Sequence, residues 1–180
     1  MTAAEALRLV EQFEPGADGL AGKSRELLLQ LLKHTDAPFS RHQFTPGHIT
    51  CTALVLHPTE ARALFMFHHR LHRWLLPGGH VEPSDLNLAA AAAREATEET
   101  LVEINDSCAP QLAGIDVHGI PPKKDEPFHL HHDLIWRLRA SSPEIAVTDE
   151  APSVCWADES DWNRLGVAES IRNAIRRARP

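Results

Sequence analysis

The feature that most constrains the fold is one strong helix-forming segment, residues 86–100, set among segments with the character of strands. The segment LNLAAAAAREATEET contains no glycine or proline and is rich in alanine, the best helix former. Ser84 or Asp85 is expected to cap its N-terminus. Helical patterns also occupy both ends of the chain. A mixed strand pattern interrupted by one central helix, with helices at the ends, predicts an α/β sandwich.

Strands are expected where apolar and β-branched residues cluster between turn residues. The expected strands are 48–57, 61–70, a short one within 73–83, 111–120, 129–140 and 153–157. The first two should form a hairpin across Pro58. The short third strand should lead into a glycine turn at Pro77-Gly78-Gly79, and the tail after Asp158 should form one short and one longer helix.

The first part of the chain has a different pattern. Apolar residues recur at helical spacing over 3–13 and 23–34, and the segment EPGADGLAG separates the two. The buried stripe of the second helix is expected to consist of Leu27, Leu28, Leu31 and Leu32. We therefore predict an N-terminal helical extension over residues 1–44, packed on a main domain over residues 45–180.

Composition excludes several classes of protein. No apolar run approaches the ~20 residues that a membrane-spanning helix needs, and the first ten residues lack the apolar centre of a signal peptide, so a cytoplasmic location is expected. Three separated cysteines argue against a disulfide framework or a structural zinc site. A net charge of -7 argues against non-specific nucleic-acid binding. The one basic cluster, Arg172 to Arg179, suits the C-terminal end of a helix.

Three glutamates near the end of the central helix carry the clearest chemical signal. Glu95, Glu98 and Glu99 stand at i, i+3 and i+4, which places them within an arc of roughly 100° on a helix. Like charges this close repel, and a hard divalent cation such as magnesium is their natural partner. The alternative is a solvated acidic face, to which Arg94 would add an i,i+4 pair with Glu98. The glycine pair upstream, which lets backbone approach a ligand, favours the metal site.

Residues 78–102 resemble the Nudix box, G-x5-E-x7-R-E-U-x-E-E-x-G-U with U aliphatic. Gly79 matches the first glycine, Arg94-Glu95 and Glu98-Glu99 match the central REUxEE, and Val102 matches the last aliphatic position. The match has departures. Asp85 stands in place of the first glutamate, with eight rather than seven residues before Arg94. Leu101 stands in place of the second glycine, so the turn that ends the helix is expected to differ.

The resemblance, which covers roughly residues 46–165, implies a Nudix-type α/β/α sandwich of mixed sheet and a hydrolase that cuts phosphoanhydride bonds. It implies that Mg2+ or Mn2+ is bound by Glu95, Glu98, Glu99 and the Gly78 carbonyl. Arg94 would orient a glutamate. Glu98, Glu99 or a carboxylate outside the box, for which we choose Glu150, would activate the attacking water.

The substrate that we expect is a nucleoside diphosphate linked to another group. The partners would be this nucleotide-type small molecule and, because Nudix enzymes often dimerise, a second copy in a homodimer, with no membrane and no nucleic acid. The alternative is a non-catalytic Nudix fold that binds a nucleotide as a sensor.

Several further residues are candidates for substrate binding. His80 follows the glycine pair, and Glu82 lies within the box. Strand alternation places His129, His131 and Asp133 on one face and His132 on the other. Two histidines and an aspartate on one face could bind a transition metal or contact phosphate, or could form a polar wall beside the pocket. His48 could join this cluster if its strand lies nearby.

Overall fold

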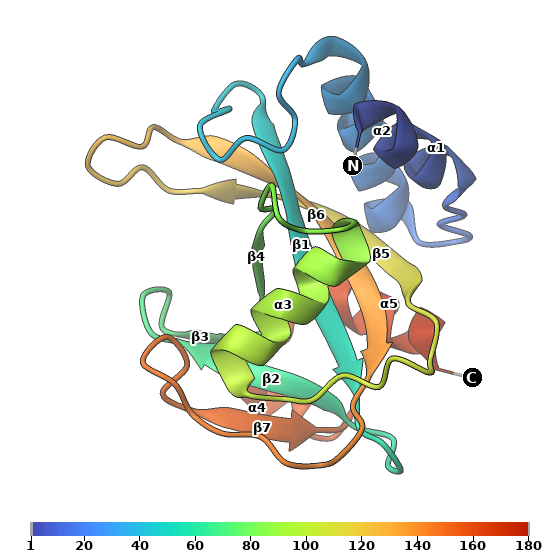
Figure 1. Ribbon diagram of the computed structural model, residues 1–180, viewed down its shortest axis with the longest axis vertical. Helices are drawn as coiled ribbons and strands as arrows, with labels where there is room; N and C mark the ends of the chain where they lie inside the picture. The colour runs from blue at the N-terminus through green and yellow to red at the C-terminus, as the bar shows by residue number, and fades with distance from the viewer. Residues whose placement is uncertain (1, 180) are drawn as a thin grey trace.

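The computed structural model describes residues 2–179. Its elements, in chain order, are α1 Ala3–Gln12, α2 Gly19–His34, β1 Gly47–Leu56, β2 Ala63–His68, β3 Arg73–Leu75, β4 Gly78–His80, α3 Leu88–Thr100, β5 Gln111–Ile120, β6 His129–Arg139, β7 Val154–Ala157, α4 Trp162–Leu165 and α5 Glu169–Ala178 (Figure 1). No helix within residues 2–179 is long and apolar enough to cross a membrane.

The sheet is mixed, as the sequence predicts. Its main path runs β3-β2-β1-β6-β5, and β4 and β7 pair with β1 and β2 respectively. Strands β1 and β6 are parallel over their full paired length, from Gly47↔Leu130 to Leu56↔Arg139, and the other pairings are antiparallel. The expected hairpin of β1 and β2 is present, with Leu56 opposite Ala63.

Helices cover both faces of this sheet, which confirms the α/β/α sandwich. Helix α3 crosses β1 on one face, where α1 and α2 also pack beside β5 (Figure 1). Helices α4 and α5 cover the other face. Gly114 of β5 lets α5 approach closely, because a Cβ there would lie 2.9 Å from the Ala174 side chain. Side chains of α1 and α2 share one hydrophobic core with α3 and β1. The domain boundary at residue 45 stays a prediction.

The N-terminal helices differ in detail from the sequence expectation. Helix α2 begins at Gly19 rather than residue 23, because the Asp18 side chain caps it by accepting from the N–H groups of Leu20 and Ala21. Its buried stripe includes Leu28, Leu31 and Leu32, but Leu27 is exposed and Leu29 is buried in its place. The cap of α3 also differs from the expectation: Asn87, not Ser84 or Asp85, accepts the hydrogen bond from the Ala90 N–H.

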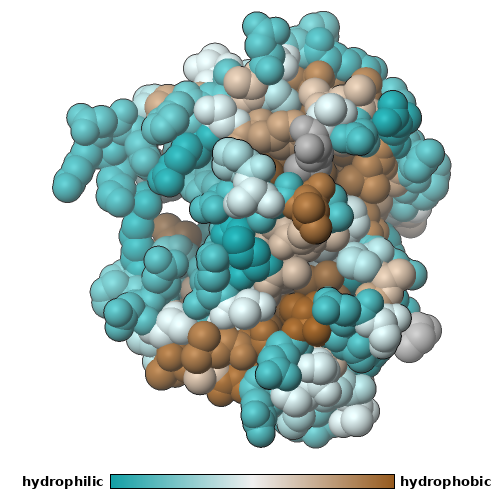
Figure 2. All heavy atoms as spheres, viewed as in Figure 1, coloured by the Kyte–Doolittle hydropathy of each residue, from teal (hydrophilic) through white to brown (hydrophobic). Residues whose placement is uncertain are grey.

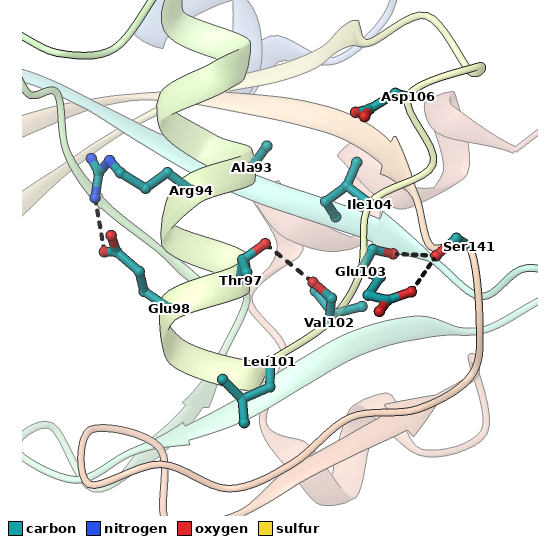
Figure 3. Close-up of a pocket in the computed structure, with 10 residues that line it drawn as sticks. All are labelled: Ala93, Arg94, Thr97, Glu98, Leu101, Val102, Glu103, Ile104, Asp106 and Ser141. Atoms are coloured by element: carbon teal, nitrogen blue, oxygen red, sulfur yellow. Dashed lines mark hydrogen bonds and ion pairs between the residues drawn. The ribbon is translucent and has the colours of Figure 1, made fainter.

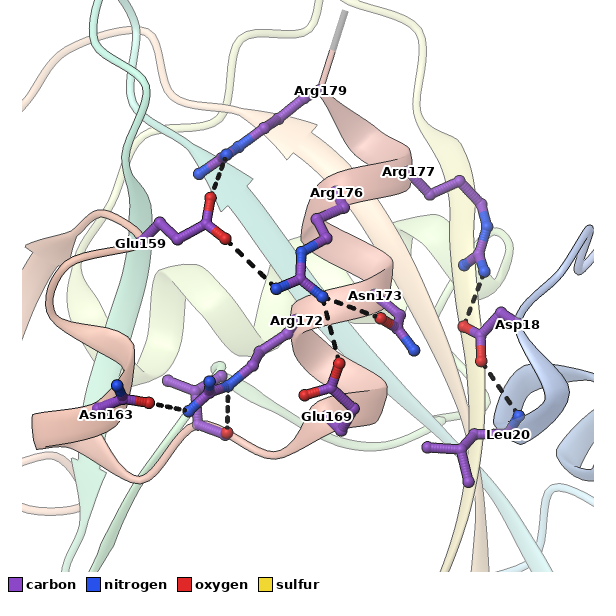
Figure 4. A network of polar contacts seen from close by, with 11 residues as sticks. Asp18, Leu20, Glu159, Asn163, Glu169, Arg172, Asn173, Arg176, Arg177 and Arg179 are labelled. Atoms are coloured by element: carbon purple, nitrogen blue, oxygen red, sulfur yellow. Dashed lines mark hydrogen bonds and ion pairs between the residues drawn. The ribbon is translucent and has the colours of Figure 1, made fainter.

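The C-terminal arginines are held by partners within the chain (Figure 4). Arg177 of α5 forms an ion pair with Asp18 at 2.9 Å and so connects α5 to the N-terminal helices. Arg176 and Arg179 both pair with Glu159. Their guanidinium groups also lie 5.5 and 5.4 Å from the centre of the buried Trp162 ring. These contacts give the basic cluster a structural role in fixing α5 against the sheet.

The face along which α3 runs is mixed in polarity, whereas the tip of the β5–β6 hairpin is hydrophilic. Figure 2 shows teal residues near the middle of this face, next to beige and brown ones. It also shows the hairpin tip, at the left of the view, standing away from the body of the molecule. Of the glutamates of α3, Glu98 is exposed to solvent, Glu95 is partly buried and Glu99 is buried.

Candidate active site

A cavity of about 460 Å³ lies where the sheet-facing side of α3 meets β4. Glu95 and Glu99 of α3 contribute carboxylates to it. Its other walls come from the strands β1 to β6, from the turn between β2 and β3, and from the start of α5 with the segment before it. The two glutamates are four residues apart and share one side of the helix. Glu99 is buried and Glu95 is partly buried. The spacing of the motif thus places two acidic groups inside one cavity.

The glycine pair next to these carboxylates forms a strand rather than the expected turn. Gly78 and Gly79 belong to β4 and pair with Thr52 and Cys51 of β1. Neither glycine has a positive φ, so they are needed for space. A Cβ at Gly79 would lie 2.7 Å from the Glu95 carboxylate, and one at Gly78 would lie 2.6 Å from the Cys51 carbonyl oxygen. The absence of side chains therefore lets α3 bring its carboxylates directly against the sheet.

The surroundings of Glu99 and Glu95 disfavour negative charge. Burial raises the pKa of Glu99 to about 7; the Gly78 N–H, which donates to Glu99 Oε2 at 2.9 Å, opposes this, and the charges of Glu95, Glu150 and Glu98 add to it. Burial also raises the pKa of Glu95, against the nearby charge of Arg94. A cation bound between these carboxylates would offset their mutual repulsion and their loss of hydration, so the arrangement suits a cation-binding site.

Arg94 organises the start of the acidic segment. Its Nε donates to Asp85 Oδ1 at 3.0 Å and its Nη2 to Asp85 Oδ2 at 3.2 Å, a two-point contact with a side chain that is only 4% exposed. It also contacts Glu95 Oε1 at 3.0 Å and donates to the His80 carbonyl. The hydrogen bonds that Arg94 donates to Asp85 raise the pKa of Arg94 above its ordinary value. Asp85 therefore reaches Arg94 even though eight residues, rather than the seven of the Nudix box, separate the two.

Glu98 lies outside the cavity. Its side chain is 59% exposed, and it accepts from Arg94 Nη1 at 3.0 Å as the expected i,i+4 pair. Figure 3 shows this pair on the flank of α3 that points away from Ser141. Both residues line a second pocket, of about 640 Å³. The lining of that pocket is partly apolar, and its acidic side chains, Glu98, Glu103 and Asp106, are exposed. The role of Glu98 as a metal ligand and catalytic group stays a prediction.

Leu101, at the position of the second box glycine, does not change the turn that ends the helix. Its φ is 54° and its ψ is 19°, the left-handed conformation that glycine usually adopts at this position. Its N–H donates to the Thr97 carbonyl at 2.9 Å. The expectation of a different turn is therefore wrong: the chain keeps the glycine geometry, and the leucine carries the strain.

The other candidate residues divide between the cavity and its surroundings. Glu150, His80 and His131 line the cavity together with Asp133. Glu82 does not line it and is exposed. His129 is buried behind His131, with a ring-centroid distance of 5.2 Å.

The strand alternation that placed these β6 side chains is borne out by their contacts. The rings of His129 and His131 lie against each other, and His131 and Asp133 line one cavity. His132 is buried, and both of its ring nitrogens lack a partner among the described residues.

Asp133 is occupied by hydrogen bonds from β1. Thr50 Oγ1 donates to Asp133 Oδ1 at 2.9 Å and Thr52 Oγ1 to Oδ2 at 2.6 Å. Burial raises the pKa of Asp133, in opposition to these hydroxyl donors and to the nearby His118. This carboxyl group therefore joins β1 to β6 beneath the cavity, and its oxygens are already engaged.

Sequence reasoning did not select several residues of the cavity. Arg70 and Arg73 supply positive charge, and Trp74 supplies a flat apolar surface. His118 Nδ1 and Asp116 Oδ2 lie 3.1 Å apart on β5. Burial opposes protonation of His118, but the Asp116 hydrogen bond and the charges of Asp133 and Asp116 together outweigh it, so the pKa of His118 is raised. The alternation of Asp116 and His118 along their strand was the available signal for this pair.

The NUDIX domain model matches residues 48–178, well over half of the chain. The chain belongs to the Nudix family. The match reaches further toward the C-terminus than the resemblance in the sequence suggested and takes in α5. With the Glu95–Glu99 cavity in place, the chain is a Nudix hydrolase acting on phosphoanhydride bonds. No curated protein sequence matches it significantly.

Solved structures similar to this chain share its Nudix fold at low sequence identity. The MutT protein from Bacillus halodurans has a TM-score of 0.53 and 18% identity, with 71% of this chain and 79% of that chain covered. The MutT protein from Methanosarcina mazei has a TM-score of 0.51 and 19% identity, with coverage of 72% and 91%. The Nudix domain of Shewanella oneidensis NrtR, complexed with ADP ribose, has a TM-score of 0.50 and 18% identity, with coverage of 83% and 94%.

Proposed function

We propose that this Nudix protein is a Mg2+- or Mn2+-dependent hydrolase of a nucleoside diphosphate linked to another group. Water would attack one of the two phosphorus atoms and break its bond to the bridging oxygen, which leaves with the other phosphate, so that the products are a nucleoside monophosphate and the phosphorylated second group. The observation that carries the proposal is the pair of carboxylates Glu95 and Glu99 inside a cavity whose far walls hold arginines and a tryptophan. Such a cavity matches a molecule with a central diphosphate and an aromatic base.

The residues present fit a hard divalent cation. Oxygen ligands from Glu95 and Glu99 suit Mg2+, and because burial raises the pKa of both groups, a bound cation would stabilise their charged forms. When bound, the ion would neutralise charge on the diphosphate and acidify a coordinated water. We propose Gly78 and Glu98 as further ligands. Glu98 would have to leave Arg94 to reach the ion, which makes it the weaker member of the set.

The remaining residues would bind and orient the substrate. Arg70 and Arg73 would contact the phosphates, Trp74 would stack on the base, and Arg94 would hold Glu95 in place through its contact with Asp85. Glu150 lines the same cavity and would accept the proton of the attacking water. The structure with bound ADP ribose supports a ligand of this chemical class, on the strength of the shared fold. The homodimer and the cytoplasmic location stay predictions.

A screen of dinucleotides, nucleotide sugars and nucleoside triphosphates tests the proposal. Each compound is incubated with the wild-type chain and Mg2+, Mn2+ or a chelator, and the products are separated by chromatography. We expect a monophosphate product from at least one diphosphate-linked compound and none with chelator. Binding without turnover across the screen would instead favour the sensor alternative, and full turnover in excess chelator would contradict the metal mechanism.

A further inference from the structure

A row of histidines crosses four neighbouring strands on the face that lines the cavity. His48 of β1 stands opposite His131 of β6 in the parallel pair, and His131 stands opposite His118 of β5 in the antiparallel pair. His80 of β4 pairs with Thr50, two residues from His48 on the same face of β1. Ring-centroid distances along the row are 5.1 Å for His80–His48, 4.8 Å for His48–His131 and 5.7 Å for His131–His118.

Three of these imidazoles converge. His48, His80 and His131 each offer one ring nitrogen, and these nitrogens all lie within 4.8 Å of one another. Nitrogen ligands around a tetrahedral zinc ion stand about 3.3 Å apart, given a Zn–N distance of about 2.0 Å. The nitrogen–nitrogen distances would therefore have to shorten by at most about 1.5 Å, and small rotations of the three side chains would achieve this.

His48 is already oriented as a ligand. Its Nδ1 donates to the Gln43 carbonyl at 3.1 Å, which fixes the tautomer and leaves Nε2 as an acceptor. Residue 48 is fully buried, and its Nε2 has no hydrogen-bond partner among the described residues. A backbone carbonyl on one ring nitrogen with a lone pair free on the other is the usual arrangement around a metal-binding histidine.

The charge state of the cluster suits a metal. Burial, together with the neighbouring His48, lowers the pKa of His80 to about 4. Burial and the adjacent histidines lower the pKa of His131 to about 2. Near neutral pH both imidazoles are uncharged, so each has an unprotonated nitrogen that can coordinate a metal ion.

We propose that His48, His80 and His131 bind one borderline transition-metal ion, foremost Zn2+, separate from the Nudix carboxylate centre. Three neutral imidazoles suit Zn2+, whereas the hard ion Mg2+ prefers oxygen. Asp133 does not belong to the set because Thr50 and Thr52 occupy its oxygens. His129 does not belong either, because its ring stacks on the His48 ring and it is not among the three residues whose ring nitrogens converge.

The fourth coordination position faces the cavity. His80 and His131 line the same cavity as Glu95 and Glu99, so a water molecule or a phosphate oxygen of a bound nucleotide would complete the tetrahedron. The set differs from the one that the β6 sequence suggested, which was His129, His131 and Asp133. Because β6 pairs with β1 and β1 pairs with β4, the residues next to His131 are His48 and His80.

Equilibrium dialysis with elemental analysis tests the site on metal-stripped protein. The protein is dialysed against Zn2+ in the presence of saturating Mg2+, which keeps the carboxylate centre occupied. We expect one Zn2+ per wild-type chain, and an affinity at least ~100-fold lower for His80→Ala. His118→Ala, from the same wall but outside the ligand set, should change the affinity less than about 3-fold. Glu95→Gln should retain the zinc, because it alters only the carboxylate centre.

A second measurement requires no substitution. X-ray absorption at the zinc edge of the wild-type protein should show three imidazole ligands and one oxygen ligand. Circular dichroism establishes whether His80→Ala remains folded, and the absorption result decides the matter if it does not. Zinc held by an all-oxygen shell, zinc lost in Glu95→Gln but kept in His80→Ala, or no zinc retained by the wild type would each overturn the proposal.

Discussion

The burial of Glu99 leads to a pH-dependent stability of the metal-free protein. Its pKa rises from 4.5 in a model peptide to about 7 in the folded chain. This difference between the folded and unfolded pKa corresponds to about 3 kcal/mol in the free energy of unfolding. Because the folded pKa is the higher one, the neutral carboxyl group is tolerated below pH 4.5 and its stability contribution is fully present there. That contribution declines as the pH rises, and is lost above about pH 7.

Glu99→Gln removes this titration while keeping the size of the side chain. In excess chelator, the free energy of unfolding of the variant relative to wild type should therefore increase by about 3 kcal/mol between pH 4.5 and pH 8. Urea unfolding followed by circular dichroism at several pH values measures it. Adding Mg2+ at pH 8 should stabilise the wild type and leave Glu99→Gln nearly unchanged.

Glu98→Gln provides the matched comparison on the same helix. The Glu98 side chain lies in solvent beside Arg94, so its substitution relieves no burial and weakens a surface pair. Its stability should hold or fall by less than about 1 kcal/mol. If the unfolding free energies of Glu99→Gln and wild type run parallel from pH 4.5 to pH 8 in chelator, the reasoning about this buried carboxylate is wrong.

Three further predictions concern sites where the structure departs from a simple pattern. Leu101 has a left-handed backbone, so Leu101→Gly should be more stable to urea than Leu101→Ala by about 1 kcal/mol. Inside a helix the order would be reversed, because glycine is the poorer helix former. A more stable alanine variant would show that residue 101 is not strained. Gly79→Ala should abolish hydrolysis with the fold retained, because its Cβ would displace Glu95, while Gly19→Ala, with open space around it, should have normal kinetics. His132→Leu should stabilise the protein by about 1 kcal/mol, because it removes two buried ring nitrogens without partners; a lower unfolding free energy would reveal a partner for them.

Local patterns in the sequence predicted most of the fold. The strands and the central helix follow from residue composition and periodicity, and the Nudix box identifies Glu95 and Glu99 because their four-residue spacing fixes a shared side of a helix. Errors arose where a tertiary contact overrides a local preference. Leu29 rather than Leu27 is buried, because helix α2 packs against β5 with that side. The helix begins at Gly19 because the Asp18 side chain caps it there.

The composition of the site required knowledge of strand register. The sequence could place His129, His131 and Asp133 on one face, but it could not show that Thr50 and Thr52 already bind Asp133. Nor could it show that β4 pairs with β1 through the two glycines, which brings His80 to the same row as His48. Helix spacing alone also did not separate Glu98, which turns toward Arg94 and solvent, from Glu95 and Glu99.

The central claim is that Glu95 and Glu99 hold the ion with which this Nudix cavity cuts its substrate. The rate of hydrolysis of the best compound from the screen, measured against Mg2+ concentration, tests it most directly. We expect wild-type turnover to saturate with Mg2+ and Glu99→Gln to lose at least about 100-fold in rate at any Mg2+ concentration, while Glu103→Gln, an exposed glutamate beyond the helix, retains the wild-type curve. Wild-type turnover and Mg2+ dependence in Glu99→Gln would contradict the account.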